Sequence, residues 1–273
     1  MSRAQPPLVS IITPVYNGER YLEDSIRSVL AQDYPAVEHI VVDGGSRDAT
    51  LDILKRYEDR IAWRSERDGG MYEAVNKGLR LARGEFALYL NSDDLLLPRG
   101  ISTLVAALEA DPQAALAYGD YFQIDAKGRE IGLVQSRQVS FRDMLNWSLS
   151  IFTGTMLFRR SLLREVGFFD DRLRFAADYE FCLRLASRGR RFIAVAEPVA
   201  LYRIHDGQLT RTGWSLWREA LAVNRRYGGK TVSPFYLRYL VTRLFAIVPR
   251  AILDLPNLKP LWKAGRRFFR ISR

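Results

Sequence analysis

A run of apolar residues leads directly into two carboxylates in the stretch Phe86-Ala87-Leu88-Tyr89-Leu90-Asn91-Ser92-Asp93-Asp94. Residues 86–90 are almost continuously apolar, which is typical of a strand that is buried on both faces of a parallel sheet. Asp93 and Asp94 therefore stand just beyond the carboxyl end of that strand, where open α/β sheets bind ligands. The stretch predicts an α/β fold with an acidic ligand-binding edge.

The residues on either side of this stretch alternate short apolar runs with helical patterns. In the first half the pattern predicts strands at 8–13, 37–43, 61–65 and 86–90, separated by helices at 19–32, 48–57 and 71–82. In the second half it predicts a hairpin of 116–125 with 130–135, strands at 155–158, 192–195 and 199–202, and a helix at 178–187. Strands separated by helices favour parallel pairing, so Thr13-Pro14 and Asp43-Gly44-Gly45 should reach the same edge as the carboxylates.

Asp93 and Asp94 have the chemistry of a site for a hard divalent cation, Mn²⁺ or Mg²⁺. Such a cation would stabilise the charge that develops on a departing diphosphate. The alternative is that the two side chains only cap the helix that follows Pro98.

The turn Asp43-Gly44-Gly45-Ser46 follows a second predicted buried strand. Its glycines let the backbone turn closely beneath a ligand, and Asp43 can accept a hydrogen bond from an N–H group of a nucleotide base. The alternative is a turn without a ligand, in which Ser46 or Asp48 caps the next helix. The turn does not match the G-x-G-x-x-G fingerprint of dinucleotide-binding proteins.

Composition excludes several classes of protein. With 48% apolar and 26% charged residues, the 273-residue chain has the composition of an ordinary globular protein. The single cysteine, Cys182, excludes an internal disulfide and fits a reducing compartment. No run approaches the roughly 18 apolar residues of a spanning helix, and residues 1–7 lack the apolar core of a secretory signal. We therefore expect a cytoplasmic location.

Positive charge is concentrated in the last part of the chain. Residues 211–273 contain 14 of the 41 Lys and Arg residues but only two acidic residues, Glu219 and Asp254. Aromatic and apolar side chains alternate with arginines near 235–250, as in helices that lie in a membrane interface. This basic extension is predicted to contact an anionic membrane surface, which would make the protein peripheral at the cytoplasmic face. The alternative is a helix packed on the domain with a solvated basic face. No nucleic-acid recognition motif accompanies the charge.

Several motifs together resemble those of family-2 glycosyltransferases with the GT-A fold, in the branch that builds bacterial surface polysaccharides. They are Val9-Ser10-Ile11-Ile12-Thr13-Pro14-Val15-Tyr16-Asn17, Val42-Asp43-Gly44-Gly45-Ser46-Arg47-Asp48, residues 66–78, Leu90-Asn91-Ser92-Asp93-Asp94, Gly167-Phe168-Phe169-Asp170, Ala177-Asp178-Tyr179-Glu180 and Tyr202-Arg203-Ile204-His205. They follow in family order from about residue 8 to residue 210.

The resemblance implies a role for each matching position. Contacts with the nucleotide sugar fall on Thr13, Pro14, Tyr16, Asp43, Asp68, Lys77, Asn91, Ser92 and Asp94. Asp93 and His205 match the metal site, Asp178 matches the general base, and Asp170 matches the acceptor loop. Two positions depart from the family pattern: Asn91 replaces the first acid of the D-x-D stretch, and Ala177 replaces the acid that usually precedes the base.

Asp178 and His205 also have roles that need no catalysis. Asp178 begins a predicted helix, where a carboxylate can cap the first turn. The helix dipole would lower its basicity there, whereas exclusion of water would raise it. His205 stands before Asp206-Gly207 and could be an ordinary loop histidine.

These observations predict a GT-A domain at 1–210, with a nucleotide-binding half at 8–95 and an acceptor-side half at 96–210, followed by a basic helical extension at 211–273. The resemblance implies inverting transfer of a sugar, which we expect to be UDP-linked, to a hydroxyl of a saccharide or lipid-linked saccharide. One alternative is a sugar-phosphate nucleotidyltransferase, which needs a basic glycine-rich loop that residues 14–18 lack. The other is a nucleotide-sugar-binding regulator without catalysis, which the two departures from the motif would allow.

Overall fold

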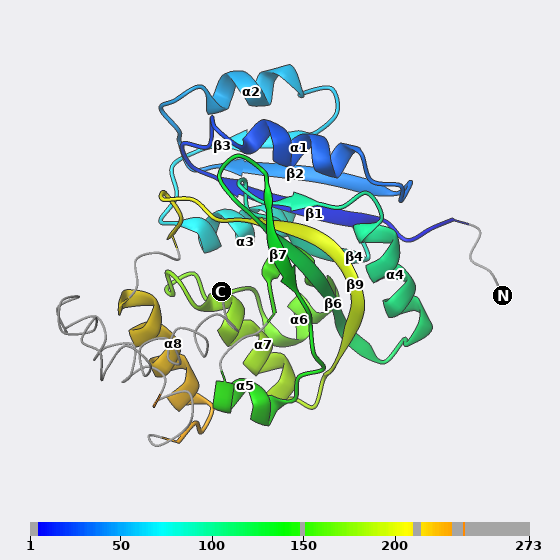
Figure 1. The fold of residues 1–273 in the computed structure, drawn as a ribbon, viewed down its shortest axis with the longest axis vertical. Helices are drawn as coiled ribbons and strands as arrows, with labels where there is room; N and C mark the ends of the chain where they lie inside the picture. Colours follow the sequence, from blue (N-terminus) through cyan, green and yellow to red (C-terminus); the bar gives the residue numbers. More distant parts are fainter. Residues whose placement is uncertain (1–4, 148–150, 210–213, 231–236, 238–273) are drawn as a thin grey trace, which may run out of the picture.

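The computed structural model describes residues 5–147, 151–209, 214–230 and 237. Within these ranges a sheet of nine strands carries helices on both faces (Figure 1). The strands lie in the order β3 (Ala62–Ser65), β2 (Val37–Asp43), β1 (Val9–Val15), β4 (Phe86–Tyr89), β8 (Leu157–Arg159), β6 (Ala114–Ile124), β9 (Arg191–Arg203) and β5 (Leu95–Leu96), while β7 (Glu130–Val134) pairs with β6.

The first half of the chain forms the parallel part of the sheet. Strand β1 pairs in parallel with β2 and β4, and β2 pairs in parallel with β3. The connections contain helices α1 (Leu22–Leu30), α2 (Thr50–Arg56) and α3 (Met71–Leu81). Val15 pairs with Asp43, and Asp43 pairs with Ser65, so these strands end level with one another. The predicted α/β fold is confirmed, and these strand ends lie at one edge of the sheet, as predicted.

Strands β1 and β4 and most of β2 are buried on both faces, as continuous apolar strands require, whereas the edge strand β3 is mostly exposed. Ile11 lies in a core with α4 (Gly100–Ala110), whereas its neighbour Ile12 lies in a core with α3 and with the later helices. Helix α3 lies close against β1, because a Cβ atom on Gly78 would stand 2.5 Å from Cγ2 of Ile12. A larger residue at position 78 would push this helix, and the loop before it, away from the sheet.

The second half adds antiparallel strands, so the complete sheet is mixed. Strand β8 is antiparallel to β4 and β6, β7 is antiparallel to β6, and β5 is antiparallel to β9. The helices of this half are α5 (Phe141–Trp147), α6 (Leu162–Val166) and α7 (Ala177–Ser187), with a 3₁₀ turn at Thr153–Thr155. Short α5 and α6 were not among the predicted elements. Ser140 and Asp143 satisfy each other's backbone N–H groups at the start of α5, as in a capping box.

Residues 191–203 form one strand, where the sequence predicted two. Strand β9 runs parallel to β6, and its pairing moves from Val195, opposite Gly119, to Pro198, opposite Asp120. The residues between them, Ala196 and Glu197, are exposed. Proline cannot donate a hydrogen bond and is accommodated at such a bulge. The bulge interrupts the apolar pattern without ending the strand.

Helix α8 (Trp214–Arg226) belongs to the predicted basic extension and packs on the domain. Ala220, Leu221 and Val223 are buried in the core that also contains α7. The segment near 235–250 that was predicted to lie in a membrane interface falls outside the described residues, apart from Leu237. Among the described residues, no helix has the length and apolar character needed to cross a membrane.

Candidate functional site

The carboxylates that follow β4 meet the residues that end β9. Nε2 of His205 lies 2.9 Å from Oδ2 of Asp93. The backbone N–H of Arg203 donates to Oδ1 of Asp94 at 2.9 Å, and Nδ2 of Asn91 donates to Oδ2 of the same carboxyl at 3.2 Å. Two segments more than 100 positions apart therefore form one polar centre at the edge that was predicted to bind a ligand.

The two neighbouring carboxyl groups, of Asp93 and Asp94, differ in their exposure to solvent. The Asp93 side chain is 24% exposed, whereas Asp94 is 1% exposed. Burial, together with the charge of Asp93, raises the pKa of the Asp94 carboxyl well above its ordinary value. Asp93 is therefore the carboxylate that can reach a ligand, and Asp94 fixes the backbone at the end of β9.

Arg203 was quoted within a motif but given no role by the sequence. Its side chain is 4% exposed, its Nε donates to the carbonyl oxygen of Asp93 at 3.0 Å, and its guanidinium lies 4.5 Å from the ring centre of Tyr21. The Tyr21 ring in turn lies 4.9 Å from the His205 ring. Arg203 and Tyr21 thus hold Asp93 and His205 in place. The sequence contains little signal for these two roles. Tyr21 lies outside every motif, and Arg203 lies within a motif that did not indicate its role.

This centre fits a divalent cation that is shared with a ligand. The described residues contain no cluster of three or more His, Cys, Asp or Glu side chains that could enclose a metal by themselves. Asp93 and His205 offer one oxygen and one nitrogen, and the buried Oδ1 of Asn91 has no hydrogen-bond partner. Mg²⁺ is often held by one or two carboxylates and by phosphate oxygens of the substrate. The residues present suit that arrangement.

The predicted base-binding carboxylates lie on either side of Gly44. Asp43 is fully buried and accepts hydrogen bonds from the backbone of Gly45 and Ser46, from the Ser46 hydroxyl and from the Ser65 hydroxyl at 2.6 Å. Its carboxylate therefore holds the ends of β2 and β3 together.

Asp68 lies directly over the same glycine. A Cβ atom on Gly44 would stand 2.8 Å from Oδ2 of Asp68, so only glycine allows this approach. The Asp68 carboxyl accepts the backbone N–H of Gly70 at 2.9 Å, and partial burial raises its pKa. Asp68 remains partly exposed, and of the two carboxylates it is the one that a base could contact.

The other predicted donor contacts differ in their exposure. Thr13 is fully buried, and its hydroxyl lies 2.9 Å from Nε2 of His39, while Pro14 is buried in the same strand. Tyr16 is 63% exposed in the loop after β1. Lys77, on α3, forms ion pairs with Glu66 at 3.1 Å and Glu73 at 2.9 Å. Ser92 is partly exposed between Asn91 and Asp93.

Asp178 lies in the first turn of α7 and is partly exposed. Its Oδ1 accepts the backbone N–H of Tyr179 at 2.7 Å. Burial raises the pKa of the Asp178 carboxyl to about 6, although hydrogen bonds from Tyr179 and from the Tyr72 hydroxyl act in the opposite direction. A carboxyl with such a pKa can accept a proton near neutral pH, which is what a general base requires.

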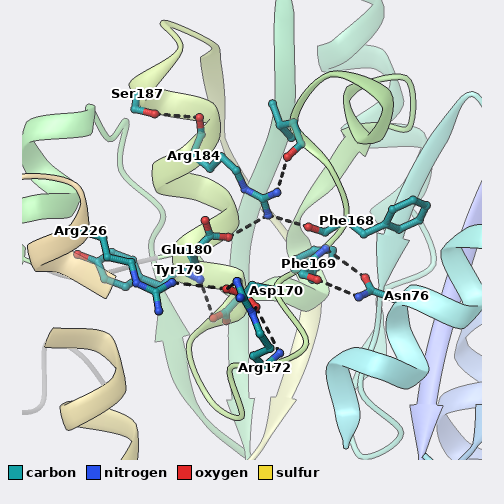
Figure 2. A network of polar contacts seen from close by, with 12 residues as sticks. Asn76, Phe168, Phe169, Asp170, Arg172, Tyr179, Glu180, Arg184, Ser187 and Arg226 are labelled. Atoms are coloured by element: carbon teal, nitrogen blue, oxygen red, sulfur yellow. Dashed lines mark hydrogen bonds and ion pairs between the residues drawn. The ribbon is translucent and has the colours of Figure 1, made fainter. Parts of the chain in front are cut away.

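Asp170 lies in a loop that is held from two sides (Figure 2). Arg172 binds its carboxylate with two hydrogen bonds of 2.8 and 3.0 Å, and Arg226 of α8 approaches to 3.5 Å. On the other side of the loop, Asn76 of α3 exchanges two hydrogen bonds with the backbone of Phe169. The carboxylate of Asp170 is therefore engaged within the protein and shapes the loop.

The fold and this edge define a glycosyltransferase of the GT-A type. Residues 10–167 match the model of glycosyl transferase family 2, so the chain belongs to that family. It is 34% identical over 219 residues to an uncharacterized glycosyltransferase of Rickettsia typhi. That alignment covers 76% of this chain and 67% of the Rickettsia protein. It is 34% identical over 250 residues to an uncharacterized glycosyltransferase of Mycobacterium tuberculosis, with coverage of 85% and 90%. A PGL/p-HBAD biosynthesis glycosyltransferase of Mycobacterium bovis is 31% identical over 186 residues, with coverage of 66% and 70%.

Solved structures show the same fold at lower sequence identity. Residues 1–349 of Staphylococcus aureus TarS, in complex with UDP-GlcNAc, align with a TM-score of 0.66 and 19% identity over 97% of this chain and 82% of that one. A mannosyltransferase from Pyrobaculum calidifontis, in complex with GDP-Man and Mn²⁺, aligns with a TM-score of 0.66 and 23% identity over 97% and 81%. The predicted family and fold are confirmed.

Proposed function

We propose that this glycosyltransferase transfers a sugar, with inversion, from a UDP-linked donor to a hydroxyl of a saccharide or lipid-linked saccharide acceptor. The observation that carries the proposal is the pairing of Asp93 with His205, 2.9 Å apart, in a chain that also places Asp178 with a pKa of about 6 at the start of α7. TarS has been seen with UDP-GlcNAc and with UDP, which supports the choice of nucleotide. The name of the Mycobacterium bovis relative, a PGL/p-HBAD biosynthesis glycosyltransferase, supports a role in glycolipid or surface polysaccharide assembly.

In this proposal the donor lies at the carboxyl edge of β1, β2 and β4. Asp68, with Asp43 behind it, binds the base, and the exposed Tyr16 covers the nucleoside beside Thr13 and Pro14. Lys77 lies near the donor, while Asn91 and Ser92 border the ribose or the sugar and the buried Asp94 supports them from behind. Asp93 and His205 would hold Mn²⁺ or Mg²⁺, which would stabilise negative charge on the diphosphate.

The acceptor lies on the side of Asp170 and Asp178. An oxygen of the Asp178 carboxylate accepts the proton of the acceptor hydroxyl. The acceptor oxygen forms its bond to the anomeric carbon as the bond from that carbon to the diphosphate oxygen breaks. Attack from the side opposite the leaving group inverts the configuration. Burial of Asp178 favours the step, because it makes the carboxylate more basic than an exposed one.

The test begins with a thermal-shift screen of UDP-linked and GDP-linked sugars, with and without Mn²⁺, since a bound ligand raises the melting temperature. Donors that stabilise the protein are then assayed for release of the nucleoside diphosphate with saccharide and glycolipid acceptors. Metal-dependent stabilisation and turnover by a UDP-sugar support the proposal. Turnover with GDP-sugars alone would overturn the choice of nucleotide. Binding without turnover across the acceptor panel would favour the regulator.

We further propose that residues beyond α8 bind an anionic membrane surface. The support is the composition of 227–273, which contains ten Lys and Arg residues but a single acidic residue, Asp254. Each Lys or Arg near an anionic leaflet contributes about 1 kcal/mol of binding free energy, so a few engaged residues suffice for attachment. A protein attached in this way would meet lipid-linked acceptors at the cytoplasmic face.

A further inference from the structure

The carboxylate of Glu219, on α8, accepts hydrogen bonds from three successive backbone N–H groups of a distant loop. Arg174 donates to Oε2 at 3.0 Å, while Phe175 and Ala176 donate to Oε1 at 2.7 and 2.8 Å. These three residues lead directly into α7. Ala176, the residue before the helix, makes no side-chain capping hydrogen bond. Glu219 therefore satisfies, from a separate helix, three backbone donors of the loop before α7, whereas the first-turn N–H of Tyr179 is accepted by Asp178 itself.

This loop determines where the Asp178 carboxylate stands. Asp178 follows Ala176 by two residues, and its carboxylate accepts hydrogen bonds from its own backbone N–H, from the Tyr179 N–H and from the Tyr72 hydroxyl. The Tyr72 hydroxyl also lies 3.4 Å from the carbonyl oxygen of Phe175. The position of Asp178 thus depends on the backbone of residues 174–177, which Glu219 holds from one side and Tyr72 from the other.

Helix α8 is fixed well enough to act as a support for this loop. The Nδ2 atom of Asn224 donates to the carbonyl of Leu145 at 2.9 Å and to the Tyr179 hydroxyl at 2.8 Å. The Tyr227 hydroxyl donates to Oε1 of Glu180 at 2.6 Å. Arg226 reaches the Asp170 carboxylate, as Figure 2 shows. These contacts join α8 to α5, to α7 and to the acceptor-side loop.

We propose that Glu219 is a positioning residue for sugar transfer, which holds residues 174–176 so that the Asp178 carboxylate meets the acceptor hydroxyl. This inference rests on the proposed function. The family usually has an acid at the position of Ala177, which is fully buried and has no carboxyl group. The second carboxylate near this loop is therefore that of Glu219, on α8. The negative charge of Glu219 also contributes to the raised pKa of Asp178, behind the larger effect of burial.

The experiment is a double-mutant cycle in the full chain, with Glu219→Gln and Asp178→Asn separately and together. The assay follows release of nucleoside diphosphate from the donor that stabilises the parent most, with Mn²⁺ and an acceptor that the parent uses. We expect Glu219→Gln to lower kcat about 10- to 100-fold, as small misplacements of reacting groups do, with the donor KM nearly unchanged. In the Asp178→Asn background the same change should lower kcat by less than about twofold, because the group that it positions is already inactive.

Tyr227→Phe is the matched control, since it removes another hydrogen bond between α8 and α7 without touching the loop. Its kcat should stay close to that of the parent. Hydrogen exchange of the 174–176 amides should accelerate in Glu219→Gln and not in Tyr227→Phe. If the glutamine variant does not fold, Glu219→Asp keeps the charge on a shorter side chain and should give an intermediate loss of kcat.

Each outcome decides between the inference and the function on which it rests. A parent that turns over no donor refutes the proposed function and, with it, this role of Glu219. An active parent whose kcat is unchanged by Glu219→Gln refutes the inference and leaves the function standing. An equal loss in both backgrounds would also refute it, because Glu219 would then act independently of Asp178.

Discussion

Nε2 of His205 lies 2.9 Å from Oδ2 of Asp93, although 112 positions separate the two residues. His205 follows β9 and Asp93 lies between β4 and β5, and β5 pairs directly with β9. The pair therefore depends on the fold of both halves. It gives the partly exposed carboxylate a nitrogen partner at the edge where a diphosphate would bind.

Asp93→Ala should abolish the gain in nucleotide affinity that Mn²⁺ provides. Turnover should fall by about 100-fold or more, because a bound cation can contribute several kcal/mol to stabilisation of the leaving group. Titration of UDP with and without Mn²⁺ measures the affinity. Asp59→Ala, at an exposed carboxylate after α2, is the control and should behave as the parent. Undiminished affinity and rate of the parent in EDTA would contradict the metal assignment.

Asp178→Asn should retain donor binding but reduce transfer by about 10²- to 10⁴-fold, the usual contribution of a general base. In the parent, kcat/KM should rise with pH to a plateau above about 6, because the base must be unprotonated and its pKa is raised to about 6. Steady-state rates between pH 5 and 8 measure this rise in kcat/KM. Transfer by the variant at the parental rate would place the base elsewhere.

The same substitution should change the pH dependence of stability. The folded-state pKa of Asp178, about 6, exceeds the ordinary value of 3.8, so the folded protein binds this proton more tightly than the unfolded chain. Its contribution to stability is complete below about pH 4 and is lost as the pH rises through 6. Asp178→Asn should therefore be the more stable protein at pH 8, by up to about 3 kcal/mol, and lose that advantage near pH 4. Denaturant unfolding at both pH values checks this, and an equal difference at both would contradict a raised pKa.

The basic residues beyond α8 should hold the protein on anionic liposomes. The flotation of the full chain should be compared with that of a chain that ends at Lys230. The shorter chain retains helix α8, with its packing on the domain, and Glu219. The shorter chain should float less, and part of the full chain's attachment should survive raised salt if apolar side chains insert. Equal flotation of the two chains would exclude 231–273 as the anchor. A full chain that ignores anionic liposomes would contradict membrane attachment altogether.

Strands β1, β2 and β4 could be predicted closely, because they are mostly buried on both faces and rich in apolar residues. Strand 37–43 was predicted with its observed bounds, and the carboxylates after 86–90 did reach the edge of the sheet. Strand β9 was divided in the prediction because Ala196, Glu197 and Pro198 are exposed at a bulge. A pattern of apolar residues records burial, and it cannot show that hydrogen bonding continues through an exposed bulge.

The supporting residues of the site could not be predicted, because their roles depend on long-range contacts. Glu219 was counted only as one of two acids in a basic segment, yet it binds amides 43 to 45 positions earlier. Arg203 was quoted within a motif without a role, yet it is buried against Asp93 and Tyr21. Neither arrangement leaves a local spacing that the sequence could reveal.

The contacts between α8 and the loop before α7 also decide how this enzyme could be recombined with its relatives. The family match ends at residue 167, before Asp178 and before Glu219. A chimaera joined between α7 and α8 would pair a loop with a helix that was not selected to bind its amides. A junction placed before residue 167 would transfer Asp170, the loop and Glu219 together. Exchange of acceptor preference between homologues should therefore succeed only when these segments travel as one unit.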